Sequence, residues 1–142
     1  MAANASPIYS RIGAIGGIGS ATLLTVSAAD YTGVGAQNIS IFTADANNGG
    51  FVQRLRFKSI GANTGAAVAR VYINNGSTNA TATNNVFYGE ISLPITAATT
   101  TTATPDIDYP LNIALPANYR LYVGLGATVT AGWVVSAIAG AY

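Results

Sequence analysis

The apolar residues of this chain recur at every second position, not at every third or fourth. Segments rich in Val, Ile, Tyr, Phe and Thr alternate with polar residues throughout, and no stretch sustains the 3.6-residue period of a helix over several turns. The pattern therefore predicts strands and loops. We expect about eight strands, at Ala21–Ser27, Asn38–Thr43, Phe51–Ile60, Ala67–Asn74, Val86–Ile95, Tyr109–Leu115, Tyr119–Gly126 and Gly132–Ala139.

The alternation is clearest in Phe51–Ile60, where one face is expected to point inward and the opposite face to carry positive charge. The expected inward residues are Phe51, Leu55 and Phe57, and the charged residues are Arg54, Arg56 and Lys58. Arg70 lies in the next predicted strand along the chain. If the two strands form a hairpin, Arg70 widens the positive stripe.

The connections contain residues that tolerate positive φ, which tight turns need. Hairpins are therefore expected at Asn47–Gly50, Gly61–Gly65 and Asn74–Gly76, and between the last two strands around the sole tryptophan, Trp133. The stretch Thr96–Thr104 is long and polar, which suits a crossover between two sheets. Together these features predict an all-β fold: a two-sheet antiparallel β-sandwich, most simply a jelly roll.

The chain has the size of a single domain, with a glycine-rich beginning. We expect residues 1–20 to form an extended N-terminal arm and residues 21–142 to form one β-sandwich domain. Ile12–Leu24 is a poor targeting or membrane segment, because glycines interrupt it and it is shorter than the roughly 18 apolar residues of a membrane span. No membrane association is expected.

Composition points to assembly and away from catalysis. Charged residues make up 8% of the chain and the net charge is +1, so little electrostatic repulsion keeps copies apart. Cysteine and histidine are both absent, which removes the common nucleophile–base pairs and zinc ligands. We therefore expect a permanent homo-oligomer, no enzyme, no cofactor and no metal centre.

Among the acidic residues, Asp106 and Asp108 are close in sequence, and on an extended segment their carboxylates point the same way. They could form part of a calcium site, which needs six to eight oxygen ligands in all. A solvated loop, or a contact to an arginine of a neighbouring copy, explains the pair more simply. No phosphate-binding loop is present.

The basic residues are candidates for contact with a partner protein. Arg54, Arg56, Lys58 and Arg70 are few for a nucleic-acid interface, and no aromatic platform accompanies them, so we expect no nucleic acid. A solvated face is the simplest alternative. Tyrosine is abundant and is enriched at interfaces. The candidate contacts at the two ends of the chain are Tyr9, Arg11 and Tyr142.

The segments Leu115–Val123, Trp133–Val135 and Arg54–Phe57, with the Ala/Gly/Thr/Asn-rich composition, resemble small β-sandwich proteins of tailed bacteriophage virions. The resemblance covers residues 38–142. It implies a virion component on the capsid surface: a decoration or cement protein, often a homotrimer, that contacts the major capsid protein or another virion protein. The N-terminal arm would then reach onto a neighbouring subunit.

A phage fibre or tail module that binds host-surface carbohydrate or a receptor is the alternative. Such a module requires exposed aromatic residues together with Asp and Asn in one group of loops. Tyr109, near Asp106 and Asp108, is the one hint of this in the sequence.

Overall fold

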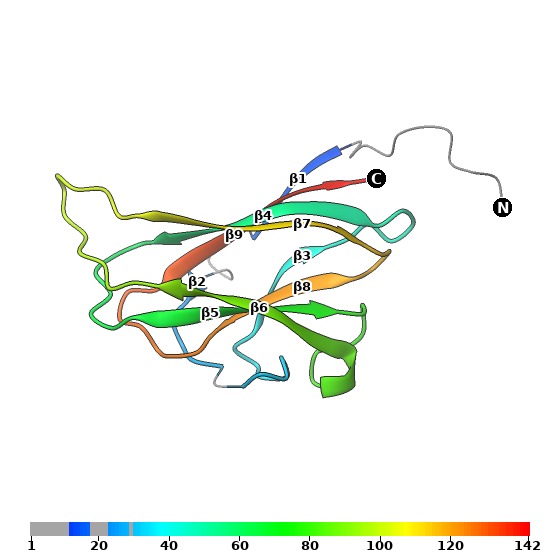
Figure 1. Ribbon diagram of the computed structural model, residues 1–142, viewed down its shortest axis with the longest axis horizontal. Coiled ribbons are helices and arrows are strands. Elements are labelled where there is room, and N and C mark those ends of the chain that lie inside the picture. The colour runs from blue at the N-terminus through cyan, green and yellow to red at the C-terminus, as the bar shows by residue number, and fades with distance from the viewer. Residues whose placement is uncertain (1–11, 18–22, 29) are drawn as a thin grey trace.

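The computed structural model describes residues 12–17, 23–28 and 30–142, and it consists of two antiparallel β-sheets packed face to face (Figure 1). The predicted all-β sandwich is confirmed. Sheet A contains β1 (Ile12–Gly16), β2 (Leu23–Leu24), β4 (Gly50–Ser59), β7 (Asp106–Leu115) and β9 (Trp133–Ala141). Sheet B contains β3 (Ile39–Thr43), β5 (Ala67–Asn74), β6 (Asn85–Leu93) and β8 (Arg120–Leu125). A short 3-10 helix, η2 (Ala82–Asn84), precedes β6.

The strand order is that of a jelly roll. Sheet A runs β1-β9-β4-β7, with β2 also paired to β9, and sheet B runs β3-β8-β5-β6. From β2 onward, successive strands alternate between the sheets except at β5 and β6, which in the described residues are the only strands both consecutive and paired. The predicted crossover at Thr96–Thr104 is confirmed, because it links β6 in sheet B to β7 in sheet A.

Most of the predicted hairpins are wrong. The turns at Asn47–Gly50 and Gly61–Gly65 carry the chain from one sheet to the other, and β8 and β9 also lie in different sheets. The exception is Asn74–Gly76, which begins the connection between the paired strands β5 and β6. Turn residues reveal where a chain reverses, but they do not reveal whether it returns to the same sheet.

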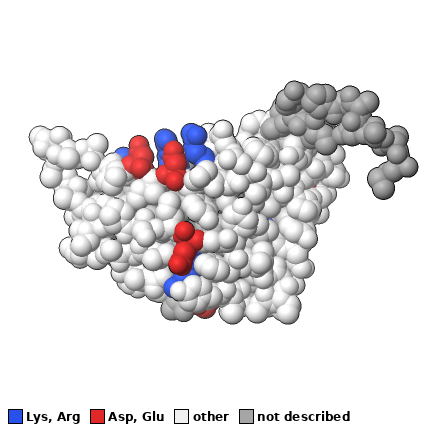
Figure 2. Space-filling view, viewed as in Figure 1, with Lys and Arg blue, Asp and Glu red and all other residues white. Residues whose placement is uncertain are grey.

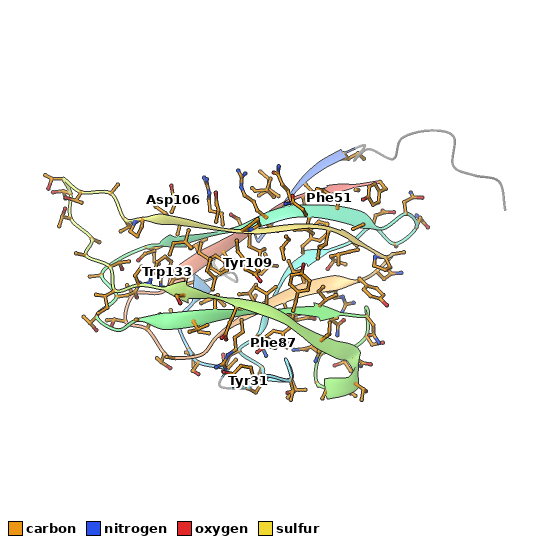
Figure 3. The ribbon with its side chains drawn as sticks, in the orientation of Figure 1. Tyr31, Phe51, Phe87, Asp106, Tyr109 and Trp133 are labelled. Atoms are coloured by element: carbon orange, nitrogen blue, oxygen red, sulfur yellow. The ribbon has the colours of Figure 1, made fainter. Side chains whose placement is uncertain are left out.

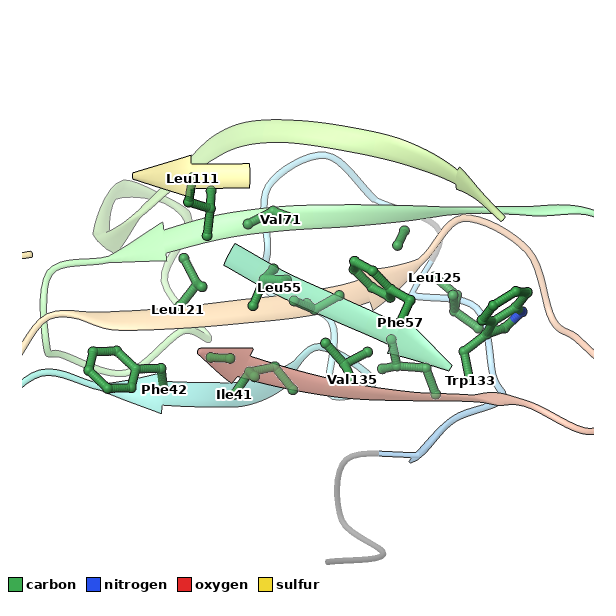
Figure 4. Packing of buried hydrophobic residues seen from close by; sticks show 14 of the residues in the cluster. Ile41, Phe42, Leu55, Phe57, Val71, Leu111, Leu121, Leu125, Trp133 and Val135 are labelled. Carbon is green, nitrogen blue, oxygen red and sulfur yellow. The ribbon is translucent and has the colours of Figure 1, made fainter. Parts of the chain in front are cut away.

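The inner faces of both sheets form one hydrophobic core (Figure 4). Leu55, Phe57 and Trp133 are fully buried in it, as the alternation of apolar residues predicts. The predicted inward position of Phe51 is wrong. The register of β4 shifts between Val52 and Arg54, so Val52 points inward in its place and Phe51 belongs to the outer face. A bulge of this kind inverts the alternation that precedes it.

The glycine-rich segment is partly built into the sheet. Residues 12–16, which we assigned to the arm, form β1 and pair with the C-terminal half of β9. A Cβ atom at Gly16 would collide with the carbonyl oxygen of Ile41 in the opposite sheet, so glycine permits this close approach. Residues 1–11 of the expected arm lie outside the described residues. In the parts of the chain that are described, no helix is long and apolar enough to span a membrane.

Candidate functional site

Three basic and two acidic side chains form a band on the outer face of sheet A, which we call the ionic band. Arg54, Arg56 and Lys58 come from β4, and Asp106 and Asp108 come from the adjacent strand β7. Figure 2 shows that charged side chains gather in few places, one of them at the upper margin over β4 and β7, while most of the visible surface is uncharged. The register brings them together, because Arg56 is directly opposite Asp108 and Lys58 is opposite Asp106.

The geometry of the ionic band leaves one side chain incompletely satisfied. Arg56 donates to both carboxylate oxygens of Asp108, from Nε at 3.0 Å and from Nη2 at 3.3 Å. Lys58 Nζ lies 3.0 Å from Asp106 Oδ1 and donates to the Thr104 carbonyl oxygen at 2.6 Å. Arg54 Nε lies 3.7 Å from Asp108, but it is buried without a hydrogen-bond partner.

These pairs are expected to contribute little to stability. The five side chains are between 37% and 51% exposed, and water screens ion pairs at such positions. The hydrogen bond from Arg56 lowers the pKa of Asp108 and raises that of Arg56. Three cations against two carboxylates leave the band one positive charge in excess. Its arrangement therefore suits a contact with a partner that offers an acceptor or a negative charge.

The acidic pair lies beside the basic residues of β4. Asp106 and Asp108 point to one side, as their spacing predicts, and both contact basic residues of their own chain. No group of three or more acidic side chains lies together in residues 12–17, 23–28 and 30–142. Basic side chains beside both carboxylates also oppose the binding of a cation.

An apolar strip runs beside the ionic band on the same face of sheet A. Ile15 of β1 is directly opposite Ile138 of β9, which is in turn opposite Arg54. Ile15 is 61% exposed. Phe51 and Gln53 border a shallow hollow of about 230 Å³ next to Ile138. The outer face of sheet A thus combines exposed Ile15 and half-buried Phe51 and Ile138 with the charges of the ionic band.

Arg70 does not extend the positive stripe, contrary to our expectation. It lies on β5 in the opposite sheet, because β4 and β5 do not pair. Its Nε is 3.7 Å from Glu90 of β6, and its Nη1 donates to the Asp30 carbonyl oxygen at 3.1 Å. Its guanidinium also stacks on the ring of Tyr31, 3.9 Å from the ring centroid.

Tyr31, Tyr72 and Phe87 form an aromatic cluster on the outer face of sheet B. Tyr31 meets Phe87 edge to face with ring centroids 5.3 Å apart, and Phe87 lies 5.8 Å from Tyr72. Figure 3 places Tyr31 and Phe87 together, on the side of the sandwich away from Phe51. The sequence did not reveal this cluster, because Tyr31 reaches the sheet only through the fold of the loop between β2 and β3.

Asp30 shapes that loop. Its Oδ1 accepts hydrogen bonds from the backbone of Thr32 and Gly33 at 2.9 and 2.7 Å, and its Oδ2 accepts one from Gly35 at 3.0 Å. The Asp30 carbonyl oxygen accepts from the Tyr72 hydroxyl at 2.7 Å. Burial, and secondarily the charge of Asp30, raise the pKa of Tyr72 to about 12. The loop is therefore held on sheet B by partly buried hydrogen bonds from Tyr72 and Arg70 to the Asp30 carbonyl oxygen.

A hollow of about 530 Å³ lies on the outer face of sheet B beside Arg70. Its lining includes Val68 and Ser92, which face each other across β5 and β6, and Gly126 at the end of β8. The lining is mostly apolar, and Arg70 supplies its charged wall.

The remaining sequence candidates are Tyr109, Tyr142, Tyr9 and Arg11. Tyr109 lies between the two sheets and packs against the core, so it is not the aromatic partner of Asp106 and Asp108 (Figure 3). Burial raises its pKa. Tyr142 follows β9 and is half-buried, and Tyr9 and Arg11 lie outside the described residues.

Comparison with known proteins identifies no relative of this chain: no family model, no curated protein and no solved structure matches it.

Proposed function

We propose that this protein is a structural component of a virion, a capsid decoration or cement protein that holds shell subunits together. In this role it forms a homo-oligomer, most simply a trimer, on the capsid surface and contacts the major capsid protein or another virion protein. It performs no catalysis and uses no cofactor.

The observation that carries the proposal is the outer face of sheet A. Exposed Ile15 and the hollow beside Ile138 supply apolar surface, whose removal from water yields about 25 cal/mol per Å² before association costs. The adjacent ionic band supplies charges in fixed positions, which set the orientation of a partner more than its affinity. Such a face suits a protein that stabilises a shell by burying apolar surface between subunits.

The exposed part of Arg54 supports the same reading. Its side chain is 37% exposed, and its Nε lies 3.7 Å from Asp108 without a hydrogen bond, so the guanidinium can take an additional acceptor from a partner. The excess positive charge of the ionic band favours an acidic contact surface on the partner. Arg54, Arg56 and Lys58 thus remain the proposed partner contacts, and Arg70 is not one of them.

The test measures the mass of the purified protein in solution, alone and mixed with isolated capsids that lack it. We expect an oligomer that binds the capsids. Ile15→Glu should convert the oligomer to a monomer, because it places a charge in the apolar strip. Ile95→Glu is the matched control: Ile95 is 64% exposed and lies outside sheet A, so this variant should assemble normally.

A wild-type monomer that ignores capsids would overturn the proposal. Equal assembly by Ile15→Glu and Ile95→Glu would show that the outer face of sheet A is not the interface. Thermal unfolding of both variants controls for folding, and since both side chains are exposed, neither substitution should disturb the core.

A further inference from the structure

We propose that the outer face of sheet B binds a neutral saccharide, in a site formed by the hollow beside Arg70, the Arg70–Glu90 pair and the exposed ring of Tyr31. This function goes beyond the proposed assembly role and uses the opposite face of the sandwich. Arg70 links the parts of the site, because it lines the hollow and also stacks against Tyr31.

The hollow has a suitable size and floor for a small ligand. Its volume of about 530 Å³ falls within the usual range of roughly 300–1,000 Å³ for small-molecule sites. Its lining includes Ser92 and Gly126, whose side chains are small or absent, together with Val68. The mostly apolar lining can pack against the C–H face of a sugar ring.

Arg70, which lines the hollow, and Glu90, which is opposite Arg70 but outside the lining, match hydroxyl groups. A hydroxyl both donates and accepts, whereas a guanidinium only donates and a carboxylate only accepts. Arg70 and Glu90 are directly opposite each other on β5 and β6, so neighbouring hydroxyls of one sugar can bind both. Arg70 Nε and the Glu90 carboxylate are 3.7 Å apart and share no hydrogen bond, and Glu90 is 46% exposed.

The charge of the site selects a neutral ligand. Arg70 and Glu90 together carry no net charge, so a ligand with its own carboxylate or phosphate would gain from Arg70 but be repelled by Glu90. Asp30, whose backbone carbonyl oxygen accepts hydrogen bonds from Arg70 and Tyr72, adds a further negative side chain in the same loop. An acidic peptide or acidic glycan is therefore a poorer match than a neutral saccharide.

Tyr31 provides the aromatic surface. It is 58% exposed, although its ring is held in place by the Arg70 guanidinium and by the edge-to-face contact with Phe87. The Asp30 hydrogen bonds also fix the loop that carries it. An exposed ring in a fixed orientation loses little entropy when a ligand packs on it. Nothing in the packing of the core requires the Tyr31 ring to lie at the surface.

The experiment screens the purified full-length protein on an array of neutral and acidic oligosaccharides and measures the best hit by titration calorimetry. We expect binding to neutral members. Tyr31→Ala should weaken the best hit about tenfold or more by removing the aromatic surface. Ser92→Phe should do the same by filling the hollow from an exposed position. Glu90→Gln, which keeps the shape but removes the charge, should weaken binding by several-fold.

Phe51→Ala is the matched control, since it removes an aromatic ring from the outer face of the other sheet. It should leave saccharide affinity within about twofold of the wild type, a difference well below 1.4 kcal/mol. Ile15→Glu should also bind normally, which separates this site from the assembly face. No binding to any neutral saccharide, binding confined to acidic glycans, or affinity unchanged by both Tyr31→Ala and Ser92→Phe would each overturn the proposal.

Discussion

Replacing Asn63 by alanine should strongly destabilise the fold, although Asn63 lies in a connection between strands. The side chain is fully buried. Its Oδ1 accepts hydrogen bonds from the backbone N–H groups of Ala131 and Gly132, both at 2.9 Å, and its Nδ2 donates to Ser59 Oγ at 2.9 Å. Asn63 also exchanges two backbone hydrogen bonds with Thr96, each 3.0 Å long. It thereby joins three connections at one end of the sandwich.

The cost follows from the groups that alanine would leave unsatisfied. Ser59 and Thr96 keep each other and the Gly61 carbonyl oxygen as partners, so only the two backbone N–H groups lose their acceptor. At about 1–3 kcal/mol for each buried donor, Asn63→Ala should cost about 3 kcal/mol, a large part of a typical total of about 5–15 kcal/mol.

Guanidinium unfolding, followed by the fluorescence of the fully buried Trp133, measures this cost. All variants should be compared at one protein concentration, because oligomerisation adds to apparent stability. Asn47→Ala is the control: Asn47 is exposed, and the change should cost less than about 0.5 kcal/mol. A loss below about 1 kcal/mol for Asn63→Ala would refute the reasoning, since it would mean that water or a backbone shift satisfies both amides.

Three further predictions concern the core and the titratable groups. Leu55→Ala should cost about 2–5 kcal/mol in guanidinium unfolding, because Leu55 is fully buried in the core, whereas Ile95→Ala should be nearly neutral. Folding raises the pKa of Tyr72, so the wild type should lose on the order of 2 kcal/mol of stability as the pH rises from about 10 to about 12. Tyr72→Phe should lose less stability over the same pH range. If the stabilities of the wild type and Tyr72→Phe fell in parallel in alkaline unfolding experiments, this prediction would be contradicted. Asp108→Asn should barely change the melting temperature at neutral pH. The small difference in melting temperature from the wild type should vanish as the pH falls through the lowered pKa of Asp108. Calorimetry at several pH values measures both.

Much of the fold could be predicted from local pattern. Alternating apolar residues located the described strands except β1, and the polar stretch Thr96–Thr104 located a crossover. Pairing could not be predicted in the same way, because a turn between strands of one sheet and a turn between sheets use the same residues. The bulge in β4 had no signal either: nothing local in Val52–Arg54 shows that one residue breaks the alternation.

For the candidate sites too, local pattern predicted some features and not others. The spacing of Asp106 and Asp108 predicted that their side chains share a face, but their partners depend on the register between β4 and β7. Arg70 and Tyr31 are brought together only by a loop that crosses sheet B, so no spacing in the sequence connects them. Residues within one strand were predictable, and contacts between distant segments were not.

The placement of the two proposed surfaces on opposite sides of the sandwich leads to a last prediction, which depends on both proposals. An oligomer assembled through the outer face of sheet A leaves every sheet B site facing outward, since Tyr31 and Phe87 lie on the side away from Phe51 (Figure 3). Several weak sites on one particle then bind a surface together, with a gain in avidity of about 10²–10⁴ when the geometry permits.

A biosensor surface carrying the best saccharide at high and at low density tests this. At high density the wild type should dissociate at least about tenfold more slowly than Ile15→Glu, because only the oligomer engages several sugars at once. At low density the two proteins should dissociate at the same rate, since each site then acts alone. Equal dissociation at high density would show that assembly does not present the sites together, whereas a difference at low density would show that Ile15 affects the site itself.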